Sequence, residues 1–189
     1  MQIELTHTQG QQLNYLLYLP TETTENSHPL ILFLHGAGER GNDLSQLKKH
    51  GIPRIVDQDP NFPFIAISPQ CPTESRWINQ VDILKSLLDH VQATHPVDSS
   101  RIYLTGLSMG GQGAWWLVAA YLDFLLPWCL SVAAHTPHLS IPKSNPRGVG
   151  HCRPWLSKPT VLKISRSGSF TVPKTVWFHS NIRGKWFQH

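Results

Sequence analysis

The residues most able to carry out chemistry lie in the stretch Gly106-Leu107-Ser108-Met109-Gly110. A serine with a glycine two residues away on either side is typical of a nucleophile elbow, a sharp turn between a strand and a helix. An apolar run at 101–105 precedes the motif, and Gly106 and Gly110 leave the room that the turn requires. We predict that Ser108 is a nucleophile at a helix N-terminus, where the helix dipole favours negative charge. The alternative is a glycine-rich turn with an ordinary serine.

A second motif lies upstream of the first. The apolar run 29–34 has the pattern of a strand buried on both faces, and it leads into His35-Gly36-Ala37-Gly38. Serine hydrolases build an oxyanion hole from backbone N–H groups in such a loop. We predict that the N–H of Ala37 or Gly38 pairs with the N–H of Met109. His35 is interpreted as a structural residue that orients the loop, and not as a catalytic one. The residues predicted to support the two turns are His35, Gly36, Gly106 and Gly110.

Three stretches, residues 34–43, 67–72 and 101–111, resemble the carboxylesterase and predicted-peptidase branch of the α/β-hydrolases. This branch includes phospholipase/carboxylesterase-like and polyhydroxybutyrate-depolymerase-like esterases, and the similarity covers residues 13–121. The resemblance implies an α/β-hydrolase fold and a serine esterase that cleaves a carboxylic ester or thioester through an acyl-enzyme. It also implies a catalytic triad in the chain order serine, aspartate, histidine.

The elements that must position these residues alternate along the chain. Apolar runs predict strands at 13–19, 30–34, 64–68 and 101–105, a short helix is expected at 43–50, and a 3.6-residue apolar period predicts a helix over 78–94. This alternation predicts an α/β fold with a parallel sheet and flanking helices, incomplete at its C-terminal side. Because active sites of such sheets lie at the carboxyl ends of the strands, His35 and Ser108 both fall in the expected place.

Length and composition limit the other possibilities. The 189 residues correspond to one domain. The N-terminus has no signal-like segment, and no apolar run is long enough to cross a membrane. Cys71, Cys129 and Cys152 show neither metal-ligand spacing nor a paired framework. We therefore expect a reduced, cytoplasmic setting, no metal and no cofactor.

Charge is distributed unevenly along the chain. Residues 1–123 hold 7 Lys and Arg against 12 Asp and Glu, a net charge of −5, whereas residues 124–189 hold 9 Lys and Arg and no acid, a net charge of +9. Such a split is found in chains with nucleic-acid or membrane-binding tails. Here the basic segment also carries four tryptophans among scattered Pro, Ser and His. We therefore predict a small-molecule ester as the partner, and neither nucleic acid nor a membrane.

The basic segment does not supply a triad in the usual order. Asp123 is the only acid after Ser108, and it follows the elbow helix at the end away from the serine. We divide the chain into residues 1–121, the N-terminal part of an α/β-hydrolase, and residues 122–189, an acid-free segment expected to be poorly ordered and not to build the second half of the sheet. The chain is predicted to be truncated as a hydrolase, and inactive.

A shift of reading frame would account for this segment. With synonymous codons, reading from the third base of the Tyr121 codon can spell Pro-Gly-Phe-Phe-Ala-Ala-Val-Val-Pro-Ile-Cys-Gly-Arg-Thr, which resembles the family's strand after the elbow helix. Reading from the third base of the Ile164 codon, which is the same shifted frame, can spell Ile-Pro-Val-Trp-Val-Phe-His-Gly-Ala-Lys-Asp-Cys-Val-Val-Pro. This resembles the family's strand with the triad acid. We infer the loss of one base near codons 121 and 122.

Three alternatives stay open at this point. Residues 122–189 can be a divergent but genuine C-terminal segment. The chain can be a binding protein that uses the same fold without chemistry. It can also be an esterase that recruits one of the later histidines as its base, namely His135, His138, His151 or His179.

Overall fold

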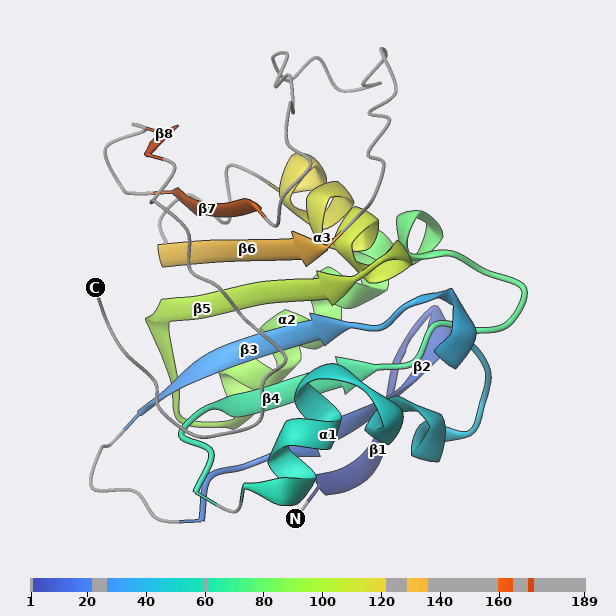
Figure 1. Ribbon diagram of the computed structural model, residues 1–189, viewed down its shortest axis with the longest axis horizontal. Coiled ribbons are helices and arrows are strands. Elements are labelled where there is room, and N and C mark those ends of the chain that lie inside the picture. The colour runs from blue at the N-terminus through green and yellow to red at the C-terminus, as the bar shows by residue number, and fades with distance from the viewer. Residues whose placement is uncertain are drawn as a thin grey trace.

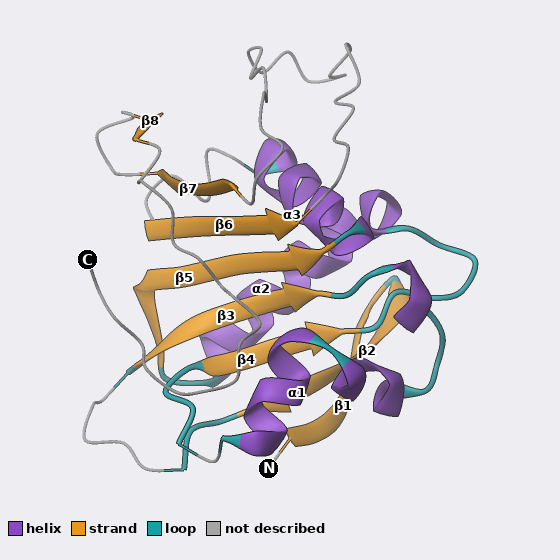
Figure 2. Cartoon of the chain, in the orientation of Figure 1, coloured by secondary structure: helices purple, strands orange, loops and turns teal. Residues whose placement is uncertain are grey.

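A mixed β-sheet forms the centre of the molecule, with helices on both of its faces (Figure 1; Figure 2). The computed structural model describes residues 2–21, 27–59 and 61–121, together with the backbone of 129–135, 160–164 and 170–171. The strands are β1 (Gln2–Gln9), β2 (Gln11–Tyr18), β3 (His28–Leu34), β4 (Ile65–Pro69), β5 (Val97–Leu107), β6 (Cys129–His135), β7 (Thr160–Ile164) and β8 (Phe170–Thr171).

The strand order in the sheet is β1-β2-β4-β3-β5-β6-β7-β8. The central strands β4, β3, β5 and β6 run parallel to one another, whereas β1 and β2 on one side and β7 and β8 on the other pair antiparallel. Parallel strands end at the same edge, and the register of β3 with β5 places Leu34 opposite Gly106. The predicted α/β fold class is therefore confirmed, and the two predicted turns lie side by side.

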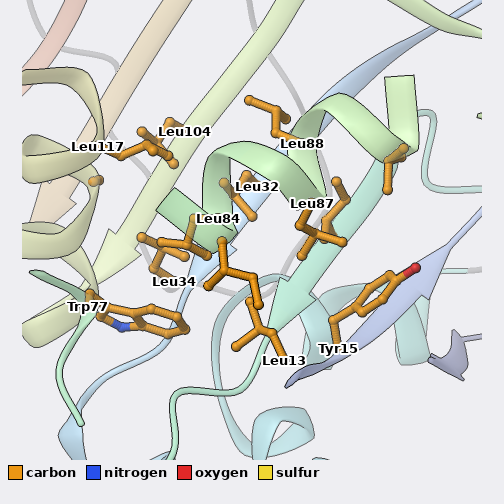
Figure 3. Close-up of a cluster of buried hydrophobic side chains, with 14 of the residues drawn as sticks. Leu13, Tyr15, Leu32, Leu34, Trp77, Leu84, Leu87, Leu88, Leu104 and Leu117 are labelled. Carbon is orange, nitrogen blue, oxygen red and sulfur yellow. The ribbon is translucent and has the colours of Figure 1, made fainter. Parts of the chain in front are cut away.

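Alternate residues of β3 serve two different cores, as expected for a strand covered on both faces. Leu30, Leu32 and Leu34 belong to the larger cluster, against α2 (Val81–Thr94) and α3 (Met109–Ala120). Figure 3 shows this cluster, in which Leu84, Leu87 and Leu88 of α2 pack onto the sheet. Ile31 and Phe33 face the other way, toward Ile52 and Val56 of α1 (Gly51–Gln58).

The helices agree with the sequence in place but not always in type. The short helix expected at 43–50 is a 3₁₀ helix, Leu44–Lys49, and the helix expected at 78–94 begins as the 3₁₀ turn Trp77–Gln80 and continues as α2. The sequence did not predict α1, which has only eight residues and contains Pro53. Proline is tolerated in the first turn because the N–H groups there have no partner within the helix. No helix of the described residues is both long and apolar enough to span a membrane.

Three short strands come from the basic segment. β6 pairs parallel with β5, β7 pairs antiparallel with β6, and β8 pairs antiparallel with β7. The sheet thus extends further than we expected, because an apolar run such as 129–135 can pair with the otherwise free backbone groups of β5. The antiparallel pairing of β7 and β8 differs from the parallel strands of a completed α/β sheet. The remainder of 122–189, and with it the prediction of poor order there, lies outside the described residues.

Candidate active site

Ser108 lies on the turn between β5 and α3, in the predicted order of strand, turn and helix. Its backbone has φ 52° and ψ −111°, and it is the only residue other than glycine with a positive φ in the part of the chain that the structure describes. A side chain in this conformation is strained and costs on the order of 1–3 kcal/mol. The positive φ turns the chain sharply, so that Ser108 stays exposed while Met109 is buried.

The glycines of the elbow are required by close backbone contacts. A Cβ atom on Gly106 would overlap the carbonyl group of Gly110. A Cβ atom on Gly110 would overlap the carbonyl group of Leu34, the last residue of β3. The first turn of α3 therefore rests directly on the end of the neighbouring strand. Any side chain at Gly110 would push the elbow away from the loop that follows β3.

Replacing Ser108 with glycine is expected to stabilise the fold relative to replacing it with alanine. Both substitutions remove the hydroxyl, but only glycine also removes the Cβ that makes φ 52° costly. The predicted difference in the free energy of unfolding is about 1–2 kcal/mol in favour of Ser108→Gly, and urea denaturation of the two variants measures it. Equal stability would show that the elbow is not strained in solution.

The loop after β3 faces the serine. A Cβ atom on Gly36 would lie 3.9 Å from the Cβ of Ser108 and 3.5 Å from the carbonyl oxygen of Leu107. The next residues form a 3₁₀ turn, Ala37–Glu39, in which Ala37 and Gly38 are exposed. The structure therefore brings together the two sets of residues that the sequence singled out, the loop 35–38 and the elbow 106–110.

His35 holds this loop from beneath. Its Nδ1 donates to the carbonyl oxygen of Gly36 at 2.6 Å, and its Nε2 accepts from the backbone N–H of Cys71 at 2.9 Å. Trp77 Nε1 donates to the carbonyl oxygen of His35 at 3.0 Å, and the two rings meet edge to face. Both imidazole nitrogens are thus engaged within the protein, and the ring is neutral with its hydrogen on Nδ1. This geometry suits a structural histidine and leaves no nitrogen for a proton from Ser108.

The pKa of His35 is lowered, first of all because burial disfavours the charged ring; the hydrogen bond to Gly36 and the charge of Glu39 oppose this shift, and Arg40 adds to it. The unfolded chain, with a pKa near 6.5, binds a proton that the folded chain rejects. The stability that the neutral His35 contributes is therefore fully present above about pH 6.5, and it is lost as the pH falls below that value. Protonation would also place a second hydrogen against the N–H of Cys71.

We predict that the free energy of unfolding decreases from pH 7 to pH 5, with His35 as a main contributor. Because the pKa of His7 is also lowered, by burial and by the neighbouring His90, the comparison is made in a His7→Asn background. Nuclear magnetic resonance titration of the imidazoles provides the direct measurement. A His35 ring that takes up its proton at or above pH 6.5 would contradict the prediction.

Several supporting residues were not found from the sequence. Gln70 Nε2 donates to the carbonyl oxygens of Glu39 and Asp43, each at 2.9 Å, and the N–H of Gly41 donates to the carbonyl oxygen of Cys71 at 3.0 Å. These contacts tie the loop to the end of β4. The stretch 67–72 belongs to the family resemblance, so it carried the signal, but nothing in the sequence stated what those residues contact.

Two further polar groups lie close to the site. Burial raises the pKa of the Cys71 thiol to about 11, so Cys71 is no competing nucleophile. Glu39 is buried, its Oε2 lies 3.8 Å from His35 Nδ1, and this oxygen accepts no hydrogen bond. Among the described residues no group of three or more His, Cys, Asp or Glu side chains could hold a metal ion.

The candidate bases named from the sequence are only partly placed. In the pairing of β5 with β6, the backbone of His135 lies opposite Leu107, the residue before Ser108. His138, His151 and His179 lie outside the described residues, as does Asp123.

A cavity of about 550 Å³ lies away from the elbow, between α2 and the turn that joins β1 to β2. Its lining includes Asp82, Lys85, Asp89 and Tyr121. Lys85 pairs with Asp89, and the Tyr121 hydroxyl donates to Asp82. Each of these polar groups thus has a partner within the cavity wall, and we assign no site to this cavity.

Comparison with proteins of known structure identifies the fold that carries the elbow. A thermostable esterase of known structure is 24% identical with a TM-score of 0.55, over 68% of this chain and 39% of that one. A ferulic acid esterase is 17% identical with a TM-score of 0.51, over 69% and 58% of the two chains. An α/β-hydrolase from the metagenome of Lake Arreo, Spain, is 16% identical with a TM-score of 0.50, over 66% and 40%. The chain thus has the α/β-hydrolase fold.

One curated protein adds a likeness in sequence. A bifunctional acetylxylan esterase/xylanase from Neocallimastix patriciarum is 27% identical over 114 residues, which are 54% of this chain and 15% of that protein. The chain matches no protein-family model. It spans well under half of the thermostable esterase and a small part of the curated protein.

Proposed function

We propose that this chain carries the nucleophile of a carboxylesterase-type serine hydrolase. Ser108 Oγ bonds to the acyl carbon of a carboxylic ester or thioester, the alcohol or thiol leaves with a proton, and water then releases the acid and frees the serine. The observation that carries the proposal is the strained elbow at Ser108, which faces the loop 35–38. Three of the named relatives are called esterases, one of them a bifunctional esterase/xylanase, which supports an ester as the small-molecule substrate.

Backbone geometry supports particular donors for the oxyanion. Because His35 binds the carbonyl oxygen of Gly36, the N–H of Ala37 in the same trans peptide points away from the buried ring. The N–H of Met109, at the first turn of α3, has no acceptor within the helix. We assign Ala37 and Met109 as the two donors. Gly38, which has no side chain, leaves space beside them for the substrate.

The present chain is expected to turn over little substrate. A serine is activated by a histidine that an acid orients, and the sequence offers only Asp123 after Ser108. We propose that residues 122–189 are read in a shifted frame and therefore lack the triad acid and histidine. The oxyanion hole alone leaves a small residual rate.

The prediction for the chain as it stands is hydrolysis of p-nitrophenyl acetate several orders of magnitude below ordinary esterase rates. Ser108→Ala and His135→Ala are the matched variants, measured with the same purified material. Ordinary esterase rates that vanish with Ser108→Ala would show the account of inactivity to be wrong. If they vanish with His135→Ala as well, the chain is an esterase with a recruited base, consistent with the position of His135 beside Leu107.

The rival from another class is a binding protein on the same fold. The two proposals differ in one observable respect. If the chain is a binding protein, Ser108 is expected not to react with a fluorophosphonate probe, either in the present chain or in the frame-restored chain. If it is a serine hydrolase, Ser108 is expected to react once the triad is present.

A further inference from the structure

Arg40 ties the loop that faces Ser108 to a second loop at the same edge of the sheet. Its Nε donates to the carbonyl oxygen of Ala37 at 3.1 Å. Its Nη1 donates to the carbonyl oxygens of Thr73 at 3.0 Å and Ser75 at 3.3 Å. One guanidinium thus holds three main-chain carbonyls from two segments of the chain.

The bond to Ala37 fixes the direction of a peptide plane. The C=O and N–H of a trans peptide point in opposite directions, and the described residues contain no cis peptide bond. The preceding plane is held too, because His35 binds the carbonyl oxygen of Gly36. Ala37 therefore lies between two peptide planes, each held by a side chain. The plane held by His35 contains the N–H of Ala37, and the plane held by Arg40 contains the N–H of Gly38.

The exposed part of this loop has little packing of its own. Ala37 and Gly38 are exposed, and a Cβ atom on Gly38 would meet no atom within 4 Å. Small residues leave room for a substrate but supply no packing. A planar guanidinium can donate in two directions at once, to Ala37 on one side and to the second loop on the other. A lysine ammonium has no such fork.

We propose that Arg40 is a positioning residue of the oxyanion hole, because its guanidinium locks the Ala37–Gly38 peptide against the loop 73–75. This lock fixes the backbone on the C-terminal side of Ala37 and so keeps the N–H of Ala37, in the peptide that His35 holds, in place for the substrate oxygen. The inference rests on the proposed function for the meaning of that N–H. Its conformational part, the locked peptide, stands independently of any chemistry.

Backbone relaxation of ¹⁵N-labelled full-length protein tests the conformational part. Wild type is compared with Arg40→Ala, with Arg40→Lys, and with Arg54→Ala, which removes an exposed positive charge on α1 as a control. The order parameters of the Ala37 and Gly38 amides are expected to fall from about 0.85 to below about 0.6 in both Arg40 variants. They are expected to stay unchanged in Arg54→Ala, with amides of α2 unaffected in every variant. Unchanged order parameters at Ala37 and Gly38 would overturn the proposal, and Arg40→Lys decides the matter if Arg40→Ala does not fold.

The catalytic part has a separate readout. Fluorophosphonate labelling of Ser108 in this chain is expected to be slow, with the oxyanion hole supporting the rate that remains. In Arg40→Ala the labelling rate constant is expected to fall roughly 10- to 100-fold and to recover when methylguanidine is added. A mobile loop with an unchanged labelling rate would overturn the role in the oxyanion hole. If Ser108 reacts neither in this chain nor in the frame-restored chain, the proposed function loses its support, while the order parameters still decide whether Arg40 locks the peptide.

Discussion

Insertion of one pyrimidine base after the second base of the Tyr121 codon is expected to raise hydrolysis of p-nitrophenyl acetate at least about a thousandfold over the present chain. The restored frame would supply the aspartate that the basic segment lacks, and a histidine further along the same frame. The magnitude follows from triad deletions, each of which costs several orders of magnitude while the oxyanion hole keeps a residual rate. Steady-state kinetics on both purified chains measures the gain.

The control for this experiment is Ser108→Ala in the restored frame, which is expected to return the rate to that of the present chain. A soluble, folded, frame-restored protein without a gain in rate would refute the frame account. A gain that survives Ser108→Ala would place the nucleophile elsewhere.

Gly110→Ala is expected to cost about 4 kcal/mol or more of folding free energy. The added Cβ would overlap the backbone carbonyl of Leu34, and backbone at the centre of a packed sheet cannot move aside as a flexible side chain can. Effects of this size belong to a small set of causes, of which overpacking in the core is one. Since domains of this size are stable by about 5–15 kcal/mol, much of the variant is expected to be unfolded. Urea denaturation and the soluble yield are the measurements.

Gly38→Ala is the matched control. Gly38 lies in the same site, but its added Cβ meets nothing within 4 Å and its φ is not positive. We expect a change in the free energy of unfolding of at most about 1 kcal/mol. Equal losses from Gly110→Ala and Gly38→Ala would contradict the close contact between the elbow and β3.

The two turns of the site could be predicted because each is a local pattern. The continuous apolar run before His35 and the glycines around Ser108 state the order of strand, turn and helix within about ten residues. The amphipathic period of α2 was readable for the same reason. That both turns meet at one edge followed from the rule that parallel strands end together.

The contacts that hold the site could not be predicted, because they join distant parts of the chain. Cys71 fixes the tautomer of His35 from 36 residues away, and Arg40 reaches Thr73 from 33 residues away. Such pairs depend on the strand order, in which β4 lies beside β3 although α1 separates them along the chain. β1 was missed because its apolar side chains, such as Ile3 and Leu5, are exposed and give no sign of a buried face.

We propose that Ser108 and the loop 35–38 form one acyl-transfer site. The most direct test is a crystal structure of the frame-restored chain after reaction with a fluorophosphonate. We expect phosphorus bonded to Ser108 Oγ, with a phosphoryl oxygen within about 3 Å of the backbone nitrogens of Ala37 and Met109. A structure in which Ser108 is unmodified, or in which the phosphoryl oxygen faces neither nitrogen, would contradict it.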